Sequence, residues 1–126
     1  MRFNLDTCDA QTYFIKGYGP GWVNINEQEI RRSVIVAPER LLTDWPPQTF
    51  ADLAAAHFEA LLPLDLEIVL LGTGARQRFP HPKLTGVLLA HSVGVEVMDT
   101  FAACRTYNIL MLEGRRVAAA LLMMAD

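Results

Sequence analysis

The first third of the chain alternates hydrophobic and polar residues over short runs, a pattern typical of β-strands. A glycine-rich stretch at 17–21 and a tight turn at Asn26-Glu27 separate these runs, and Ala37-Pro38 ends them. The strands that the pattern predicts cover residues 12–16, 22–25 and 28–36. Because the connections are short, we expect these strands to form an antiparallel β-meander.

Helical spacing of apolar residues begins after Thr49, which is a good N-cap with Asp52 three residues later. The spacing predicts an amphipathic helix that continues to Leu61 and is ended by Pro63. Residues 66–71 follow as a continuous apolar run rich in Ile, Val and Leu. Such a run is typical of a strand buried on both faces, so we expect it to be the central strand of a sheet.

Helices and strands alternate through the second half of the chain. The spacing predicts a helix from Leu84 that ends near Gly94, while Gly86 leaves an extended conformation over 84–90 as an alternative. The further predicted elements are a strand over 95–98, a helix from a cap at Asp99 or Thr100 to Gly114, and a strand over 117–124. The last segment has a helix-forming composition, and only the alternation before it favours a strand.

A β-meander followed by alternating helices and strands predicts a three-layer α/β fold. Its central mixed β-sheet is expected to be flanked by helices, with the antiparallel meander at the N-terminal end. At 126 residues the chain is long enough for one domain that removes roughly two-thirds of its unfolded surface from water. We expect a single domain over 1–126.

The composition points to a protein with a partner. Apolar residues make up 52% of the chain and charged residues 20%, against a usual ~45–50% and ~25%, so a protein partner or a homo-oligomer is expected. The net charge of −3 argues against nucleic acid. No apolar run is long enough to span a bilayer and no signal peptide is seen, so we expect a cytoplasmic protein without membrane insertion, with Cys8 and Cys104 as reduced thiols.

The motif Gly72-Thr73-Gly74 follows the predicted central strand, where open α/β sheets often bind ligands. Arg76, Arg78 and Arg115 are candidates to supply positive charge to an anion bound there. The third glycine of a dinucleotide fingerprint is absent and no helix begins directly after the motif. A tight turn at the end of the strand is therefore the favoured interpretation.

No catalytic residue, metal site or cofactor is predicted. Cys104 lies at helical spacing between Phe101 and Asn108, which favours a small buried hydrophobe over a reactive thiolate. The three histidines lack the spacing of a metal site, and His57 falls on the apolar stripe of its helix. Three carboxylates are candidates for acid–base chemistry only if the fold brings them together: Glu96, Asp99 and Glu113.

A second group of polar residues is more suggestive of recognition or of a buried network. Thr106, Tyr107 and Asn108 form a polar triplet in a helix expected to pack on the sheet, which implies hydrogen-bonded burial or an interaction surface. Large aromatic residues beside glycine or proline either anchor loops to the core or serve as interface hot spots. These aromatic residues are Tyr18, Trp22, Trp45 and Phe79.

The chain also resembles a known family, the Mth-type (Mth938-like) domain family, which includes a mitochondrial respiratory complex I assembly factor. The stretches that carry the resemblance are 23–26, 33–38, Trp45, 72–74, 94–98, Thr100, 103–104, 106–108, 113–115 and 118–121. Here Asn26-Glu27 replaces the Asn-Gly that is common in the family. The resemblance implies a three-layer α/β fold and a strand over 117–124, and it implies binding of other proteins during assembly of membrane-associated complexes. It transfers no catalytic residue.

Two functions are compatible with these observations. The first is a non-enzymatic protein-interaction module that assists assembly of a membrane-associated complex, for which Glu96, Thr100, 106–108 and Glu113 are candidate interaction or network residues. The alternative is a small-molecule or nucleotide-like anion site at Gly72-Thr73-Gly74, with or without enzyme activity.

Overall fold

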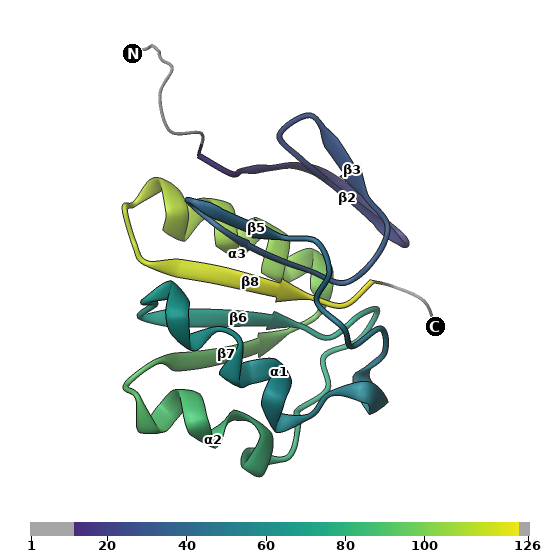
Figure 1. Cartoon of the computed structure of the whole chain (residues 1–126). Helices are drawn as coiled ribbons and strands as arrows, with labels where there is room; N and C mark the ends of the chain where they lie inside the picture. The colour runs from purple at the N-terminus through teal and green to yellow at the C-terminus, as the bar shows by residue number, and fades with distance from the viewer. Residues whose placement is uncertain (1–11, 124–126) are drawn as a thin grey trace.

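The computed structural model describes residues 12–123, which form two β-sheets and a set of helices (Figure 1). The smaller sheet contains β1 (Ile15–Gly19), β2 (Trp22–Ile25) and β3 (Gln28–Ile30) in antiparallel order. Ile25 pairs with Gln28, so Asn26-Glu27 is the tight turn that the sequence predicted. The antiparallel meander is confirmed, although β1 extends into the glycine-rich stretch as far as Gly19.

The predicted third strand, 28–36, is wrong because the chain changes sheets within it. Arg31 and Arg32 are both exposed, which interrupts the alternation of a half-buried strand after Ile30. Buried residues then form the strand β4 (Val34–Ala37) of the larger sheet. A short hairpin adds β5 (Arg40–Leu42), which the sequence pattern does not predict because three residues are too few to show a period.

The larger sheet is mixed, with the strand order β5-β4-β8-β6-β7. β6 (Ile68–Gly72) pairs in parallel with both β7 (Gly94–Met98) and β8 (Val117–Leu121), whereas β4 runs antiparallel to β8. The middle position belongs to β8 and not to the run at 66–71, which supplies its neighbour β6. All five residues of β8 are buried, and its alanines leave room for α3 to pack closely on one face.

The single helix predicted over 49–61 is wrong. The chain forms a 3₁₀ turn η1 (Phe50–Asp52), the short helix α1 (Ala55–Glu59) and a second 3₁₀ turn η2 (Leu62–Leu64). Ala54 is extended, and its amide donates to Nδ1 of His57 at 3.0 Å instead of to a helical carbonyl. This contact caps the start of α1, so a separate short helix begins at Ala55 after the extended residues Leu53 and Ala54. His57 is half-buried at this position rather than a core residue.

The two later helices agree better with the sequence. α2 (Pro82–Ala90) begins at a His81 cap and ends earlier than Gly94, so the extended alternative for 84–90 is wrong. α3 (Thr100–Leu112) is capped by Asp99, whose Oδ1 accepts from the Ala102 amide at 2.9 Å. Gly114 follows with a φ of +80°, the left-handed conformation expected where a helix ends.

The elements form three layers, which confirms the predicted fold class (Figure 1). α1 and α2 cover one face of the larger sheet, and α3 together with the smaller sheet covers the other. Alternate residues of β8 belong to the two cores: Val117, Ala119 and Leu121 on the α3 side, Ala118 and Ala120 on the α1–α2 side. The parallel strands therefore run through the middle of the molecule, and loops connect them at both ends.

Candidate functional site

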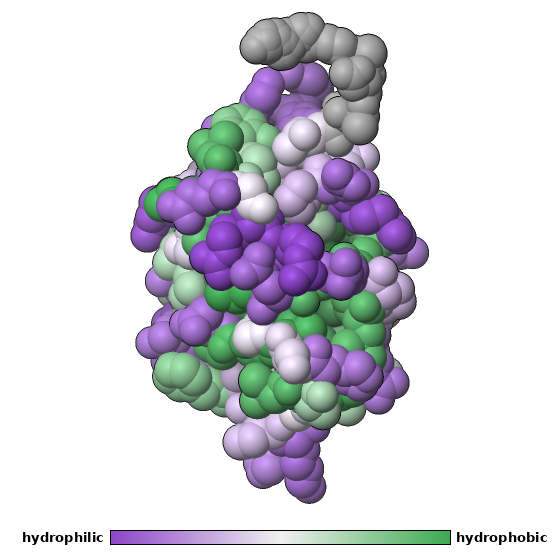
Figure 2. Space-filling view, turned by 90° about the vertical axis from the view of Figure 1, so that its left-hand side faces the viewer, coloured by the Kyte–Doolittle hydropathy of each residue, from purple (hydrophilic) through white to green (hydrophobic). Residues whose placement is uncertain are grey.

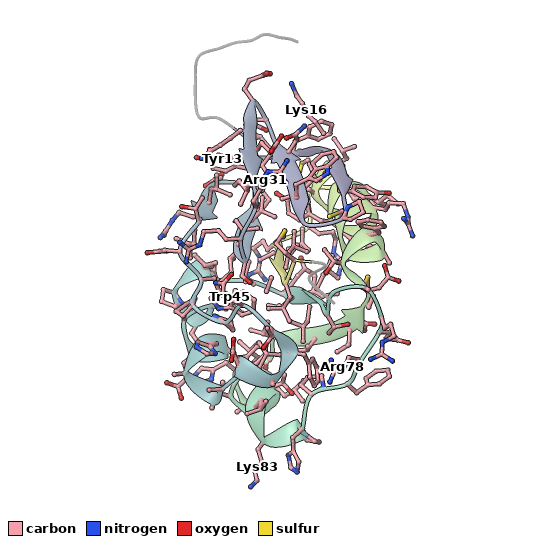
Figure 3. The ribbon with its side chains drawn as sticks, turned by 90° about the vertical axis from the view of Figure 1, so that its right-hand side faces the viewer. Tyr13, Lys16, Arg31, Trp45, Arg78 and Lys83 are labelled. Atoms are coloured by element: carbon pink, nitrogen blue, oxygen red, sulfur yellow. The ribbon has the colours of Figure 1, made fainter. Side chains whose placement is uncertain are left out.

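The carboxyl ends of the parallel strands β6, β7 and β8 lie together on one side of the molecule (Figure 3). The chain leaves β6 toward α2 on one face of the sheet and leaves β7 toward α3 on the other. A point where neighbouring strands connect to opposite faces is the usual ligand site of an open α/β sheet. Gly72-Thr73-Gly74 lies at this switch point, where the sequence placed the candidate ligand site.

Hydrogen bonds close the crevice at the switch point. The Gly74 amide donates to Oγ1 of Thr100 at 2.8 Å, and the Thr100 amide donates back to the Gly74 carbonyl at 3.0 Å. The Thr73 amide donates to the Met98 carbonyl at 2.9 Å. The Thr73 and Gly74 amides, which could otherwise bind an anion at the motif, therefore already have partners within the protein.

Close packing explains why a glycine ends β6. A Cβ atom on Gly72 would lie 3.0 Å from Cδ2 of Leu121 and 3.1 Å from both Cα and Oγ1 of Thr100. Without a side chain at this position, the first turn of α3 approaches the ends of β6 and β8. Thr100 is itself only 1% exposed.

Thr73 organises the loop that follows the motif. Its hydroxyl lies 2.5 Å from the Arg76 carbonyl, to which it donates, and accepts from the Arg78 amide at 3.1 Å. Gln77 ties the same loop to the edge of the sheet, because its side-chain amide donates to the Val97 carbonyl at 2.9 Å. The loop that carries Arg76 and Arg78 is thus fixed at both sides.

The three candidate arginines do not converge. The guanidinium of Arg78 lies over the ring of Phe50, 4.3 Å from its centroid, whereas Arg76 is exposed in the loop. Arg115 lies at the amino ends of β6 and β8, where its Nη2 is 3.0 Å from a carboxylate oxygen of Glu67. Figure 2 shows this amino-end side, with a hydrophilic band across its middle. Of the three, only Arg78 lines the space beside the glycine motif.

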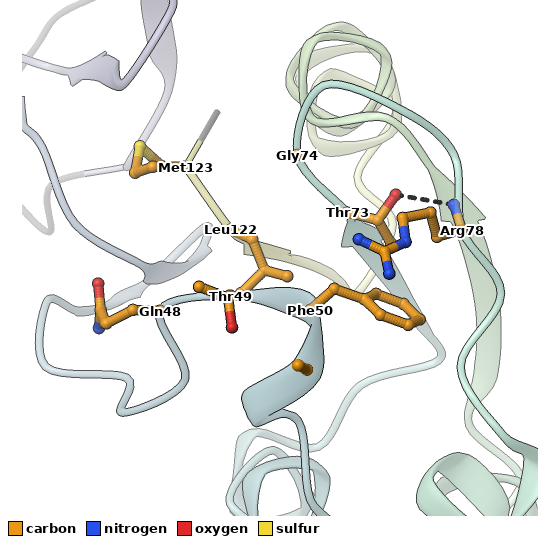
Figure 4. Close-up of a pocket in the computed structure, with 9 residues that line it drawn as sticks. Gln48, Thr49, Phe50, Thr73, Gly74, Arg78, Leu122 and Met123 are labelled. Carbon is orange, nitrogen blue, oxygen red and sulfur yellow. Dashed lines mark hydrogen bonds between the residues drawn. The ribbon is translucent and has the colours of Figure 1, made fainter. Parts of the chain in front are cut away.

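A cavity of ~200 Å³ lies beside the motif at the carboxyl ends of β6 and β8 (Figure 4). Its polar wall comes from Gln48 and Thr49 on one side and from Arg78 on the other, while Phe50 and the residues after β8 supply apolar surface. The complete lining is Gln48, Thr49, Phe50, Ala51, Thr73, Gly74, Arg78, Leu122 and Met123. No signal in the sequence assigns the 48–51 segment to this site, because only the folded chain brings it to the strand ends.

The candidate carboxylates are separated by the fold. Glu96 is exposed on β7, which is an edge strand, and Glu113 is exposed at the far end of α3 from Asp99. Asp99 is occupied as the helix cap. No group of three potential metal ligands occurs within residues 12–123. The acid–base pair that would need these carboxylates together is not formed.

Two members of the polar triplet of α3, Tyr107 and Asn108, form a hydrogen-bonded network with β1 and the residues just before it. Asn108 accepts from the Ile15 amide at 3.0 Å and donates to the Ile15 carbonyl at 2.7 Å, so its side chain pairs with the strand as a neighbouring strand would. The Tyr107 hydroxyl donates to the Tyr13 carbonyl at 2.7 Å, and burial raises the pKa of this phenol well above its usual range. Thr106 is half-buried. The network joins α3 to the smaller sheet.

Cys104 is a buried residue of the core between α3 and the sheet. Burial is the main reason that the pKa of its thiol is raised to about 12, while nearby Arg105 acts in the opposite direction. A thiol with such a pKa stays protonated and unreactive at neutral pH. The sequence-based interpretation of Cys104 as a small hydrophobe agrees with this environment. Cys8 lies outside the described residues.

Some of the aromatic residues in the loops pack against the protein and anchor their loops, whereas Phe79 is exposed to solvent. Trp45 is 2% exposed and donates from Nε1 to the His57 carbonyl at 3.1 Å, so it anchors its loop. The Tyr18 ring packs against Phe101 with centroids 4.8 Å apart, and Trp22 covers the backbone of Gly19. Phe79, by contrast, is largely exposed.

Two apolar side chains on the outer side of α3 are exposed to solvent. Ile109 is 58% and Leu112 is 73% exposed, although Met111 between them is buried. A shallow groove at Met111 and Leu112 is also bounded by Phe14, Lys16 and other residues of the smaller sheet and the chain before it. The signal in the sequence is the run of four consecutive apolar residues at 109–112, which covers every side of a helix and so cannot be buried completely.

No helix within residues 12–123 has the length and apolar character required to cross a lipid bilayer.

Comparison with known proteins supports the resemblance seen in the sequence. Residues 15–122 match a family model described as a protein of unknown function (DUF498/DUF598). A relative from Danio rerio, named NADH dehydrogenase (ubiquinone) 1 alpha subcomplex assembly factor 3, is 34% identical over 110 residues, which cover 86% of this chain and 63% of the relative. The chain therefore spans less than two-thirds of the length of this relative.

Solved structures agree with the observed fold. The crystal structure of a Bordetella parapertussis protein is 43% identical, with a TM-score of 0.84 and coverage of 90% of this chain and 97% of that one. The solution NMR structure of a Bordetella pertussis protein described as a Mth938-like domain is 36% identical, with a TM-score of 0.82 and coverage of 100% and 94%. The chain therefore belongs to the Mth938-like family of proteins of unknown function described as DUF498/DUF598.

Proposed function

We propose that this protein is a non-enzymatic interaction module that assists the assembly of a membrane-associated complex. The observation that carries the proposal is the match, over most of the chain, to relatives named as an assembly factor of NADH dehydrogenase. An assembly factor must hold a partner subunit through a surface that is free in its own folded state. A candidate for such a surface lies on α3.

The proposed docking surface, which we call the α3 surface, consists of Ile109, Leu112 and the adjoining groove. The two side chains are three residues apart, so they lie on the same side of the helix. Isolated exposed apolar residues are normal on soluble proteins, but two beside a groove provide the apolar centre of a small interface. Lys16 and Glu27 pair at 2.6 Å at the edge of this groove and supply a polar rim.

A photo-cross-linking amino acid placed at position 112 tests the proposal in cells of the source organism. We expect cross-links to a subunit of a membrane-associated complex, identified by mass spectrometry. The double substitution Ile109→Gln/Leu112→Gln should abolish co-purification of that subunit. Leu89→Gln, at a 60% exposed position on α2, is the matched control and should leave co-purification unchanged. Equal losses in both variants, or cross-links confined to soluble enzymes, would contradict the proposal.

We propose further that the chain acts in the cytoplasm and that it self-associates when its partner is absent. The support is the apolar content of the chain together with the exposed α3 surface. Fractionation with an antibody against the native protein tests the location. Sedimentation velocity over a hundredfold concentration range tests the second point: a dimer of the wild type that dissociates in the Ile109→Gln/Leu112→Gln variant supports it, and a monomer throughout contradicts it.

A further inference from the structure

We infer that the cavity beside Arg78 binds a small carboxylate with a short apolar body, which is a function beyond the proposed protein interaction. The cavity lies at the carboxyl ends of two adjacent parallel strands, β6 and β8. Its volume of ~200 Å³ equals the space of roughly six or seven water molecules. A ligand of the size of a substituted benzene ring or a branched aliphatic acid fits this volume, whereas a nucleotide does not.

Arg78 supplies the positive charge in a form suited to a carboxylate. The central carbon of its guanidinium lies 4.3 Å from the centre of the Phe50 ring, a cation–π contact. The N–H donors lie at the edges of the guanidinium, in the plane of the group, where a carboxylate can accept two parallel hydrogen bonds. Figure 4 shows this guanidinium directed toward the cavity above Phe50.

The other arginines near strand ends provide a contrast. Arg115 and Arg116 pair with Glu67 and Asp65 at the amino ends of the strands. Within the part of the chain that the structure describes, no carboxylate lies within 4.0 Å of the Arg78 guanidinium. Arg78 therefore packs on an aromatic ring, and none of the carboxylates of residues 12–123 pairs with the hydrogen-bonding edges of its guanidinium.

Both walls of the cavity are fixed before any ligand binds. On one side, the Thr73 hydroxyl accepts from the Arg78 amide at 3.1 Å and holds the loop. On the other side, the Asp52 carboxylate accepts from the amides of Gln48 and Thr49, each at 3.2 Å. These two hydrogen bonds hold the pKa of Asp52 below its ordinary value, so the carboxylate stays ionised and keeps its contacts at neutral pH. A site whose walls are already ordered loses little entropy on binding.

The other residues that line the cavity favour a carboxylate over a phosphate as the ligand. Leu122 and Met123 are 1% and 8% exposed and form apolar surface for the body of a ligand. A phosphate site normally presents several free backbone amides, but the Gly74 amide is already bonded to Thr100. One guanidinium beside an apolar wall matches a monocarboxylate better than a phosphate ester.

An NMR titration of the wild-type chain with sodium benzoate tests this inference. We expect saturable shifts at the amides of Phe50, Thr73 and Leu122. Benzyl alcohol has the same ring without the charge and should bind at least tenfold more weakly, and inorganic phosphate should produce no saturable shift at these amides. Equal affinity for benzoate and benzyl alcohol would overturn the inference, as would tighter binding of phosphate or no saturable shift with benzoate.

Two arginine variants from the same loop localise the effect. Arg78→Gln should weaken benzoate binding at least tenfold, whereas Arg76→Gln, whose side chain does not line the cavity, should bind as the wild type does. Both side chains are exposed, so both variants should fold, and their unfolding midpoints verify this. Phe50→Leu removes the ring beneath the guanidinium and should also weaken binding. The site assignment is wrong if Arg76→Gln loses as much affinity as Arg78→Gln.

Discussion

Thr100 and Gly74 exchange two hydrogen bonds at the point where β6 and β7 end, with distances of 2.8 Å and 3.0 Å. The same Thr100 hydroxyl donates to the Leu122 carbonyl at 2.7 Å, just beyond β8. One buried side chain thus joins the ends of three neighbouring strands to the first turn of α3. This contact closes the switch-point crevice, and the cavity beside Arg78 is the space that stays open next to it.

Replacing Thr100 by valine tests this connection. The substitution keeps the shape of the side chain but leaves the Gly74 amide and the Leu122 carbonyl without the hydroxyl. Because an unsatisfied buried polar group costs ~1–3 kcal/mol, we expect Thr100→Val to lower the free energy of unfolding by about 2–4 kcal/mol in urea denaturation. Thr100→Ser keeps the hydroxyl and should lose only ~1 kcal/mol for the missing methyl group. Equal stability of the two variants would contradict the role of the hydroxyl.

Two glycine-to-alanine substitutions should have opposite effects on stability. A Cβ at Gly72 would lie 3.1 Å from the Cα of Thr100, a backbone atom that cannot move without shifting α3. We expect Gly72→Ala to lower the free energy of unfolding by about 1–3 kcal/mol. Gly86 lies inside α2, and among the described residues no other element comes within 4 Å of the place that a Cβ would take. Gly86→Ala should therefore raise the free energy of unfolding by about 0.5–1 kcal/mol. Thermal unfolding of both variants measures the difference.

The attachment of the smaller sheet to α3 depends on Asn108. Asn108→Leu should cost about 1–3 kcal/mol, because the amide and carbonyl of Ile15 lose their side-chain partner. Hydrogen exchange at Ile15 should accelerate more than exchange in β6. Thr106→Ala, two residues away, is the control and should stay within about 0.5 kcal/mol of the wild type, because no hydrogen bond of its side chain occurs within residues 12–123. Uniform acceleration throughout the protein would indicate global unfolding instead.

The sequence predicted those elements whose signal is local. The Asp99 cap, the Gly114 end of α3 and the Asn26-Glu27 turn each depend on a few neighbouring residues, and all three are confirmed. The strand at 117–121 could be predicted only from the alternation of helices and strands before it and from the family resemblance, because its alanines by themselves favour a helix. Helix caps and tight turns can therefore be predicted from neighbouring residues alone, without knowing which helices or strands pack against them.

The errors arise where distant residues decide the conformation or the site. Thr49 and Asp52 have the sequence of a helix start, yet the chain is extended at Leu53 and Ala54, and His57 caps a new helix there. The 48–51 wall of the cavity is separated from Arg78 by more than twenty residues, so no spacing rule connects them. Arg115 is a candidate for the same site in the sequence because the sequence does not show whether the strand that follows it runs parallel or antiparallel to β6. The topology of the sheet places it at the opposite end.

Cys104 is expected to resist alkylation while the protein is folded. Burial raises the pKa of its thiol to about 12, so at pH 8 almost none of it is the reactive thiolate. In a Cys8→Ser background, iodoacetamide should label Cys104 only as fast as the protein unfolds, and labelling in 8 M urea should be complete. Mass spectrometry over a time course measures both rates. Rapid labelling of the folded protein would show that the thiol is accessible and contradict the inert role.

The pH dependence of stability should include a contribution from Glu67. Its carboxylate accepts from Nε of Arg115 at 3.1 Å and from the Arg116 amide at 3.1 Å, and these bonds, with Arg115 foremost, hold its pKa below the ordinary value. Because the folded pKa lies below the unfolded one, which is near 4.3, the stabilisation is fully present above about pH 5. It is lost as the pH falls through the lowered folded pKa.

Glu67→Gln removes this contribution, so its urea midpoint should lie below that of the wild type at pH 7. The two midpoints should converge as the pH falls through the lowered pKa of Glu67 in the folded protein, where the wild-type carboxylate becomes protonated. Because the Arg115 and Glu67 side chains are partly exposed, 1 M salt should also reduce the difference. Glu113→Gln, at an exposed position without an ion pair in the described residues, is the control. A difference that persists unchanged at pH 3 would mean that the shape of the Glu67 side chain stabilises the strand ends, and not its charge.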